Sequence, residues 1–155
     1  MFPHPILRGL ATVGGAGLSP IMPGTAGSLI GALPLLWILG SPHSTTLLWG
    51  SVLLTTALCV GLSRAAHRTD GAIDPGWFVL DEVAGVWVAA LACNSPHWSQ
   101  VLQAFLWFRL FDITKPWPIR RLEKASAGFG IVLDDLLAGG YAATVLLLTN
   151  RFLPI

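Results

Sequence analysis

The stretch that decides the fold is Phe108-Arg109-Leu110-Phe111-Asp112-Ile113-Thr114-Lys115-Pro116-Trp117-Pro118. It closes one apolar segment and opens a basic, proline-containing connector. Its arginine, aspartate and lysine stand out because only 11% of the chain is charged, whereas roughly 25% is usual in soluble domains. Charge at the edge of an apolar segment indicates a boundary between a hydrophobic interior and a polar surface. We expect a functional site at that boundary.

The composition is that of a membrane protein rather than of a soluble domain. Apolar residues make up 54% of the 155 residues, and the chain contains seven tryptophans and seven phenylalanines. Such aromatic side chains favour the membrane interface. The length fits a single domain, residues 1–155. The net charge of +1 gives no surface for a polyanion, so nucleic acid is not an expected partner.

Five apolar segments follow one another along the chain, and none shows the alternation of a strand. The clearest spanning segment, residues 45–62, is an uncharged run of 18 residues, close to the ~20 that a helix needs to cross a bilayer. Polar stretches at 63–76 and 112–130 are interpreted as a loop and a connector. The predicted fold class is therefore all-α, a polytopic membrane bundle of about five apolar helices, which cover residues 29–40, 45–62, 77–93, 97–111 and 131–149.

The N-terminal residues 1–12 have two open interpretations, a short interfacial helix with Arg8 on its polar side or a loosely packed arm. Three glycines between residues 14 and 17 end any helix there. The following segment, residues 20–28, predicts a turn and a helix start with Thr25 or Ser28 as N-cap. Free backbone N–H groups at a helix start favour an anion, although on this signal alone a plain capped turn is the simpler interpretation.

Small residues occur where helices could approach closely in lipid. Gly27 and Gly31 lie at the start of the first apolar segment, and a second group lies in the last one, at Ala138, Gly139 and Gly140. These positions predict close helix–helix contacts on those two segments.

The basic residues indicate how the chain is oriented. Eight of the nine lie in the N-terminal arm, in residues 63–76 or in residues 109–124. With five spans all three regions fall on one side, and by the positive-inside bias that side is the cytoplasm. The same count brings four polar groups to that side: the turn around Thr25, Asp81-Glu82, Arg109 with Asp112, and Asp134-Asp135. This placement depends on the number of spans.

Five carboxylates gathered at one depth need positive charge to offset them. Each buried unpaired acid costs about 2.5–3.5 kcal/mol at the centre of a membrane helix and less near the interface. Arg109 and Lys115 are too few to neutralise five acids, so a divalent cation is expected, and hard oxygen ligands favour Mg²⁺. Cys59 and Cys93 are isolated and no His/Cys cluster is present, which argues against zinc.

Purely structural roles for these acids remain open. Adjacent residues on a helix point ~100° apart, so one member of each acidic pair could serve only as a dipole partner at the helix start. Arg109 and Asp112, three residues apart, could form a simple ion pair. The coincidence of three such acidic groups favours a site.

Long motifs resemble those of the phosphatidylglycerophosphatase A family. They are Asp81-Glu82-Val83-Ala84-Gly85, residues 108–118, and Gly128-Phe129-Gly130-Ile131-Val132-Leu133-Asp134-Asp135-Leu136-Leu137-Ala138-Gly139, and the segment Pro23-Gly24-Thr25-Ala26-Gly27-Ser28 is similar to the first motif of that family. Order and spacing agree from about residue 20 to residue 140.

The resemblance implies a Mg²⁺-dependent phosphatase that converts phosphatidylglycerophosphate to phosphatidylglycerol and inorganic phosphate. It also implies an all-helical protein of the bacterial inner membrane. The active site would face the cytoplasm, where the substrate is made. Under this hypothesis the catalytic residues are Asp81, Glu82, Asp112, Asp134 and Asp135. Asp81, Asp112 and Asp134 would hold the metal, with Glu82 and Asp135 either as further ligands or as acceptors behind them. Thr25, Arg109, Lys115 and Arg120 would bind the substrate phosphate.

Two other classes of protein would also place carboxylates in a membrane. A CDP-alcohol phosphotransferase holds metal with aspartates at a membrane face, but the signature of that family is absent. A small cation transporter would be expected to carry its acids nearer mid-span and to need neither basic partners nor a Gly-Thr turn. A test for phosphate release against one for cation flux separates these alternatives, and the oligomeric state is left open.

Overall fold

The computed structural model describes residues 4–70, 75–122 and 129–152, and within these ranges every regular element is a helix. The predicted all-α class is therefore confirmed. Gly128 and Lys124, which belong to the predicted motif and connector, lie outside these ranges. The elements are α1 (Pro5–Ala11), the short 3₁₀ helix η1 (Ala16–Leu18), α2 (Pro23–Leu39), α3 (Ser44–Asp70), α4 (Leu80–Ala90), α5 (Trp98–Thr114), α6 (Ile119–Leu122) and α7 (Phe129–Phe152).

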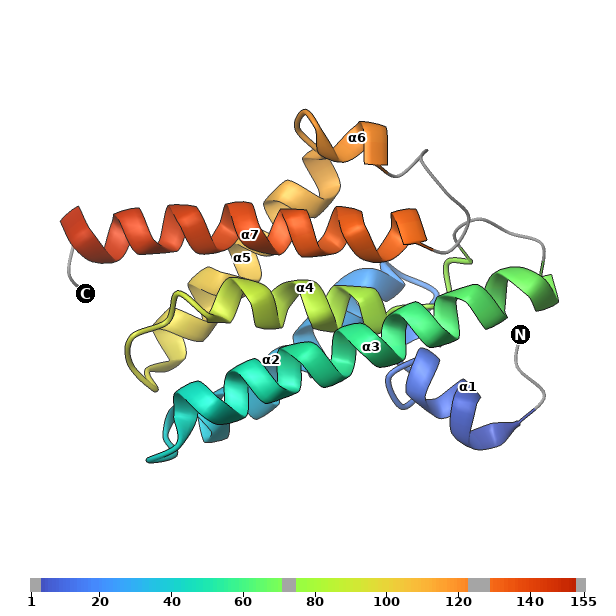
Figure 1. The fold of residues 1–155 in the computed structure, drawn as a ribbon, viewed down its shortest axis with the longest axis horizontal. Helices are drawn as coiled ribbons and strands as arrows, with labels where there is room; N and C mark the ends of the chain where they lie inside the picture. The colour runs from blue at the N-terminus through green and yellow to red at the C-terminus, as the bar shows by residue number, and fades with distance from the viewer. Residues whose placement is uncertain (1–3, 71–74, 123–128, 153–155) are drawn as a thin grey trace.

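Helix α4 is the centre of the bundle. It packs against α2, α3, α5 and α7, and Figure 1 shows it between α3 and α7. Most of its residues are buried because they are small or β-branched, among them Val86 and Ala89. Around them Phe108 of α5 and Leu146 of α7 complete the largest apolar core. The starts of α4 and α7 and the end of α3 lie at one end of the bundle, and the C-terminus lies at the other (Figure 1).

Glycines allow the neighbouring helices to approach α4 closely, as the sequence predicted. A Cβ on Gly27 would lie 2.7 Å from the Cβ of Val79, and a Cβ on Gly139 would collide with the carbonyl oxygen of Gly85. Larger residues at these positions would force the backbones apart. Gly140 makes no such contact, because nothing lies within 4 Å of a Cβ built there.

The predicted number of membrane spans is not confirmed. Two helices in the described ranges are long and apolar enough to cross a membrane, α3 over Ser44–Ala66 and α7 over Gly130–Phe152, and α2 is a shorter apolar helix. The segment 77–93 forms α4, whose 11 residues extend only about 16 Å against ~30 Å of hydrocarbon. The count of five spans therefore cannot orient the charged residues, and their meeting has to be judged from the structure itself.

The exterior of the bundle is rich in large apolar side chains. Trp37 is 76% exposed, and Leu53 and Leu147 are 66% and 59% exposed. Soluble monomers rarely expose contiguous apolar surface on this scale. The exposed residues fit the apolar composition of the chain, and together with the two candidate spans they are compatible with a membrane protein.

Two local predictions about helix ends are wrong. Residues 63–70, interpreted as part of a loop, continue α3, because Ser63 and Ala66 are buried on it and scattered charges do not interrupt a helix. Helix α2 begins at Pro23 after Met22, whose φ of 48° is left-handed, and no side chain caps it. Thr25 and Ser28 therefore lie within the first turns of α2 rather than at its N-cap.

Of the two interpretations of the N-terminal arm, the helical one agrees with the structure. Residues Pro5–Ala11 form α1, and the predicted glycines follow it, with Gly14 and Gly15 at positive φ. The arm is anchored because the Val79 N–H donates to the carbonyl oxygen of Ala11 over 3.0 Å. Whether this helix lies at a membrane interface stays a prediction.

Candidate active site

Three acidic side chains meet inside the bundle where α4 and α7 begin. Asp81 and Glu82 lie in the first turn of α4, and Asp135 lies near the start of α7. One ligand oxygen from each can be chosen so that all three lie within 4.8 Å of one another. Asp81 is 3% exposed and Asp135 is 5% exposed. We call these three residues the acidic cluster.

Arg109 and Asp112, from the last turns of α5, border the acidic cluster. The Arg109 Nη1 lies 2.6 Å from Asp112 Oδ2, so the ion pair that the sequence analysis left open as the simpler interpretation is present. The same nitrogen donates to Ser28 Oγ of α2 over 3.4 Å. The Asp112 carboxylate also lies close enough to Asp135 for the two charges to interact. Asp112 therefore connects the guanidinium of Arg109 to the acidic cluster.

Lys115 and Asp134 form a second ion pair beside the cluster. The Lys115 Nζ lies 2.7 Å from Asp134 Oδ2, and the side chains are 21% and 6% exposed. Asp134 Oδ1 accepts from the backbone N–H of Asp135 over 3.1 Å. Lys115 is the C-cap of α5 and has a left-handed φ of 41°. The two adjacent aspartates of α7 thus have different partners, Lys115 for Asp134 and the acidic cluster for Asp135.

The start of α2 closes the site on a third side. A Cβ on Gly24 would overlap Glu82 Oε1 and would lie 3.3 Å from Arg109 Nη1. Ser28, one turn later, donates from Oγ to the carbonyl oxygen of Gly24 over 2.7 Å. The Pro-Gly-Thr turn, the paired acids of α4 and the arginine of α5 therefore meet, as the sequence predicted.

Two buried polar atoms at this place have no hydrogen-bond partner, Glu82 Oε2 and Arg109 Nε, and Thr25 Oγ1, next in sequence to Gly24, has none either. The part of the chain that the structure describes contains one other such atom, Thr56 Oγ1 of α3. Buried polar groups are nearly always paired in native proteins, and an unpaired one costs about 1–3 kcal/mol. A donor on Arg109 and an acceptor on Glu82, both left without partners beside Gly24, indicate the place of a polar ligand.

Asp81 and Glu82 lie outside the two candidate spans, and their environment opposes ionisation. Burial raises the pKa of Asp81 well above its usual range, and the neighbouring carboxylates of Glu82 and Asp135 raise it further. Burial also raises the pKa of Glu82, whereas Arg109 lowers it. A cation held among these oxygens would reverse that effect. Carboxylate oxygens are the ligands that Mg²⁺ prefers, so the residues present fit this ion.

The predicted metal ligands and the acidic cluster overlap only in part. The sequence predicted Asp81, Asp112 and Asp134 as the metal ligands and left Glu82 and Asp135 open as further ligands. The oxygens that the structure brings together belong to Asp81, Glu82 and Asp135. Asp112 borders that group, because its charge interacts with that of Asp135. All of these acids were predicted from the sequence as site residues. The sequence does not indicate which of two adjacent acids faces the interior of the bundle.

Arg120 lies in a neighbouring groove rather than at the acidic cluster. This groove has a volume of about 380 Å³ and is lined by Thr114, Lys115, Pro116, Trp117, Arg120 and Arg121. The Arg120 Nη2 donates to the carbonyl oxygen of Thr114 over 3.5 Å. Lys115 is the residue that the groove shares with the site. We call this feature the connector groove.

One contributor to the site was not assigned from the sequence, Ser28 as a partner of Arg109. The turn that contains Gly24 was assigned to the site, but the contact of Gly24 with Glu82 was not foreseen. Ser28 was considered only as a helix cap. Its position four residues after Gly24, on the same face of a helix, is the signal that could have placed it at the site.

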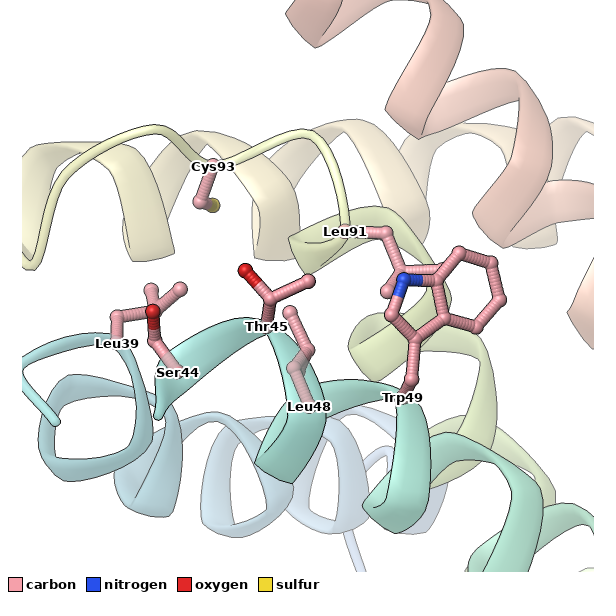
Figure 2. Close-up of a pocket in the computed structure, with 7 residues that line it drawn as sticks. All are labelled: Leu39, Ser44, Thr45, Leu48, Trp49, Leu91 and Cys93. Carbon is pink, nitrogen blue, oxygen red and sulfur yellow. The ribbon is translucent and has the colours of Figure 1, made fainter. Parts of the chain in front are cut away.

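A separate pocket lies at the other end of the bundle, where α2 ends and α3 begins (Figure 2). It is lined by Leu39, Ser44, Thr45, Leu48, Trp49, Leu91 and Cys93 and contains no charged side chain. Burial raises the pKa of the Cys93 thiol to about 12, so this sulfur is no nucleophile at neutral pH. This pocket lacks the groups that phosphate chemistry requires.

Comparison with known proteins agrees with the geometry. The family model described as phosphatidylglycerophosphatase A matches residues 9–150. The chain is 36% identical over 151 residues to phosphatidylglycerophosphatase A of Escherichia coli K12, covering 94% of this chain and 84% of that protein. It is 42% identical over 141 residues to phosphatidylglycerophosphatase A of Haemophilus influenzae, covering 88% of this chain and 83% of that protein.

A third relative carries a different name. The chain is 37% identical over 142 residues to a putative phosphatidylinositol-3-phosphatase of Bacteroides thetaiotaomicron, covering 89% of this chain and 88% of that protein. No solved structure matches the chain significantly.

Proposed function

This chain belongs to the phosphatidylglycerophosphatase A family, and we propose that it hydrolyses the phosphomonoester of phosphatidylglycerophosphate to give phosphatidylglycerol and inorganic phosphate. The observation that carries the proposal is the acidic cluster with Arg109 beside it, where Glu82 Oε2 and Arg109 Nε are buried without hydrogen-bond partners. Acid oxygens facing an arginine give both a place for a metal ion and a place for a phosphate.

We propose Mg²⁺ as the cofactor. Asp81, Glu82 and Asp135 would hold it, with Asp112 beside them, and the unpaired Glu82 Oε2 supplies an oxygen without another partner. When bound, the ion supplies Lewis-acid activation and neutralises charge on the phosphate. The proposed ligand set differs from the one predicted from the sequence, because Asp134 is paired with Lys115.

The side chains around the cluster can bind and orient the phosphate. Arg109 points Nη1 toward Ser28 and Asp112 and keeps Nε free of other partners. A guanidinium is suited to phosphate because its planar fork donates two parallel hydrogen bonds. The hydroxyl of Thr25 at the start of α2 adds a donor, and Lys115 adds charge beside Asp134.

The reaction needs a base for the attacking water. The water oxygen forms a bond to phosphorus while the bond from phosphorus to the glycerol oxygen breaks, and the water proton passes to a carboxylate. Asp112 is suited to this role because it is paired with Arg109 and its charge interacts with that of the cluster residue Asp135. Protonated Asp112 can then return the proton to the glycerol oxygen as phosphatidylglycerol leaves.

The protein is proposed to lie in the bacterial inner membrane with this site facing the cytoplasm. Two candidate spans and the apolar exterior support a membrane location. An apolar groove of about 130 Å³ between α2 and α5 supports acyl-chain binding, since Leu29 follows Ser28 and Phe105 lies one turn before Arg109. An acyl chain in that groove would start beside the proposed phosphate-binding arginine.

Phosphatidylinositol 3-phosphate is a second candidate substrate, because one relative is named for that lipid. Both lipids carry a phosphomonoester on a head group that a phosphodiester joins to diacylglycerol. The two substrates can therefore be compared in one assay on the same site.

The test is release of inorganic phosphate from each lipid in detergent, with Mg²⁺ or with EDTA, for the native chain and for Asp81→Asn. We expect release from phosphatidylglycerophosphate that needs Mg²⁺ and is lost in the variant. Release in the presence of EDTA would overturn the metal assignment. Release only from the inositol lipid would replace the proposed substrate, and no release from either would overturn the proposed function.

A further inference from the structure

We infer that the connector groove binds the phosphodiester of the lipid substrate and thereby selects lipids that carry two phosphates. The inference rests on the proposed function. Phosphatidylglycerophosphate has a terminal monoester, which is cleaved, and a diester on the other side of a three-carbon glycerol bridge. A site that holds the monoester beside the acidic cluster leaves the diester anion to be recognised nearby.

The charge of the groove fits a diester anion. Lys115, Arg120 and Arg121 line it, and they are three of the nine basic residues in the chain. Among the described residues no carboxylate forms an ion pair with Arg120 or Arg121. Their charge is therefore available to a ligand, whereas Arg109 and Lys115 already face acids.

The groove holds its arginines in place. The Arg121 guanidinium carbon lies 6.0 Å from the ring centroid of Trp117, within the range of a cation–π contact. Arg120 is tied to the carbonyl oxygen of Thr114. The carbonyl of Trp117 in turn accepts from the Tyr141 hydroxyl of α7 over 3.2 Å. These contacts fix the connector against the last helix and leave the remaining guanidinium donors for an anion.

Lys115 places the groove next to the reaction. Its Nζ is paired with Asp134, the neighbour in sequence of the cluster residue Asp135, and its side chain also lines the groove. A ligand that extends from the acidic cluster past Lys115 enters the groove. The glycerol bridge of the substrate would make this connection, with one phosphate on each side.

The experiment compares two lipids of the same acyl chains that differ in the diester. Short-chain phosphatidylglycerophosphate has it, and short-chain phosphatidic acid has only a monoester. Both are assayed as monomers below their micelle-forming concentration, so that no anionic surface is present. The variants are Arg120→Gln, Arg121→Gln and the double change, with Arg121→Lys to keep the charge. Arg151→Gln, an exposed arginine at the far end of α7, is the matched control.

We expect the double variant to lower the ratio of kcat/KM for phosphatidylglycerophosphate over that for phosphatidic acid by about tenfold or more, mainly through KM, because charge-assisted hydrogen bonds are lost. Arg121→Lys should retain part of the native preference for phosphatidylglycerophosphate, and Arg151→Gln should retain all of it. An equal fall for both lipids, or a native chain without preference between them, would overturn the inference.

Failure of the inference and failure of the proposed function are distinguishable. A native chain that does not hydrolyse phosphatidylglycerophosphate contradicts the proposed function itself. A native chain that hydrolyses it, with a double variant of unchanged preference, contradicts only the diester site. If the double variant is less active than the native chain on anionic vesicles but equally active on monomeric lipid, the groove binds the membrane surface. This result too would overturn the inference.

Discussion

Gly24 of α2 lies against Glu82 of α4 so closely that a Cβ on the glycine would take the place of the Glu82 Oε1 atom. The contact joins the first turn of one helix to the first turn of another at the acidic cluster. The position of the Glu82 carboxylate therefore depends on the absence of a side chain at Gly24, which lies 58 residues earlier in the sequence.

Gly24→Ala is expected to reduce kcat/KM for phosphatidylglycerophosphate by about 10- to 100-fold, because a displacement near 1 Å at a catalytic group has that effect. The carboxylate can swing away, so the melting temperature should change little. Gly50→Ala in α3 is the matched control, since nothing lies within 4 Å of a Cβ built there. Full activity in Gly24→Ala would show that the position of Glu82 is unimportant.

Asp135→Asn should have opposite effects on activity and on stability. The variant loses a carboxylate that lies beside Asp81 and Asp112, so repulsion and the cost of burying charge both decrease. In EDTA its melting temperature should rise by a few degrees, about 2–4 °C for each kcal/mol in a chain of this size.

The same variant should lose the stabilisation that Mg²⁺ gives the native chain, because ligand binding to the folded state raises its stability. Thermal unfolding with and without Mg²⁺ measures both effects. A Mg²⁺-induced rise in melting temperature that is equal in Asp135→Asn and in the native chain would remove Asp135 from the metal site.

Asp134 and Lys115 should behave as one unit. Because their charges are paired over 2.7 Å, removal of either leaves the other poorly compensated, and removal of both should cost less than the sum. A double-mutant cycle with Asp134→Asn and Lys115→Met should give a coupling energy of about 1 kcal/mol or more in unfolding experiments. Additive changes would contradict the pair.

The activities of the two neighbouring aspartate variants distinguish the two metal assignments. If Asp134 is a partner of Lys115 and Asp135 a metal ligand, Asp134→Asn should retain more activity than Asp135→Asn at saturating Mg²⁺. The reverse order would restore the ligand set predicted from the sequence.

Arg109→Lys and Arg109→Gln should weaken phosphate binding to different degrees. Lysine retains the charge but not the planar fork that serves Ser28, Asp112 and a phosphate together. The inhibition constant for inorganic phosphate should therefore rise in both variants, and more in Arg109→Gln. An unchanged constant in Arg109→Gln would exclude this arginine from the phosphate site.

The proposed orientation can be tested with single cysteines in a chain that lacks Cys59 and Cys93. Arg121→Cys lies beside the site, and Ser41→Cys and Arg151→Cys lie at the opposite end of the bundle. In intact cells a membrane-impermeant thiol reagent should label the latter two from outside and should reach position 121 only in inverted vesicles. The reverse pattern would place the active site outside the cell.

Much of this architecture could be predicted from the sequence because composition and segment length determine helices strongly. The number of spans could not be predicted, because α4 is apolar yet only 11 residues long. A helix buried among other helices and a helix surrounded by lipid have the same apolar composition. The continuation of α3 beyond residue 63 was missed for a related reason: charge ends the apolar run but not the helix.

The site was predicted in its residues but not in its pairing. The end of α5 and the starts of α2, α4 and α7 supply the predicted groups. Which of Asp134 and Asp135 faces the cluster depends on the rotation of α7 against α4, and neighbours on a helix point ~100° apart. That rotation is set by contacts such as Gly139 with Gly85, which a single sequence does not reveal.

The glycine contacts on α4 have a consequence for how substrate reaches the site. Gly139 brings α7 against the backbone of Gly85 in α4, and Gly27 brings α2 against Val79, the N-cap of α4. Helices in such contact have little freedom to slide or to move closer. The distances among the carboxylates are then set by backbone, and we expect them to persist between turnovers. Substrate entry would then require movement only of side chains at the edge of the site, while the helix backbones keep their positions.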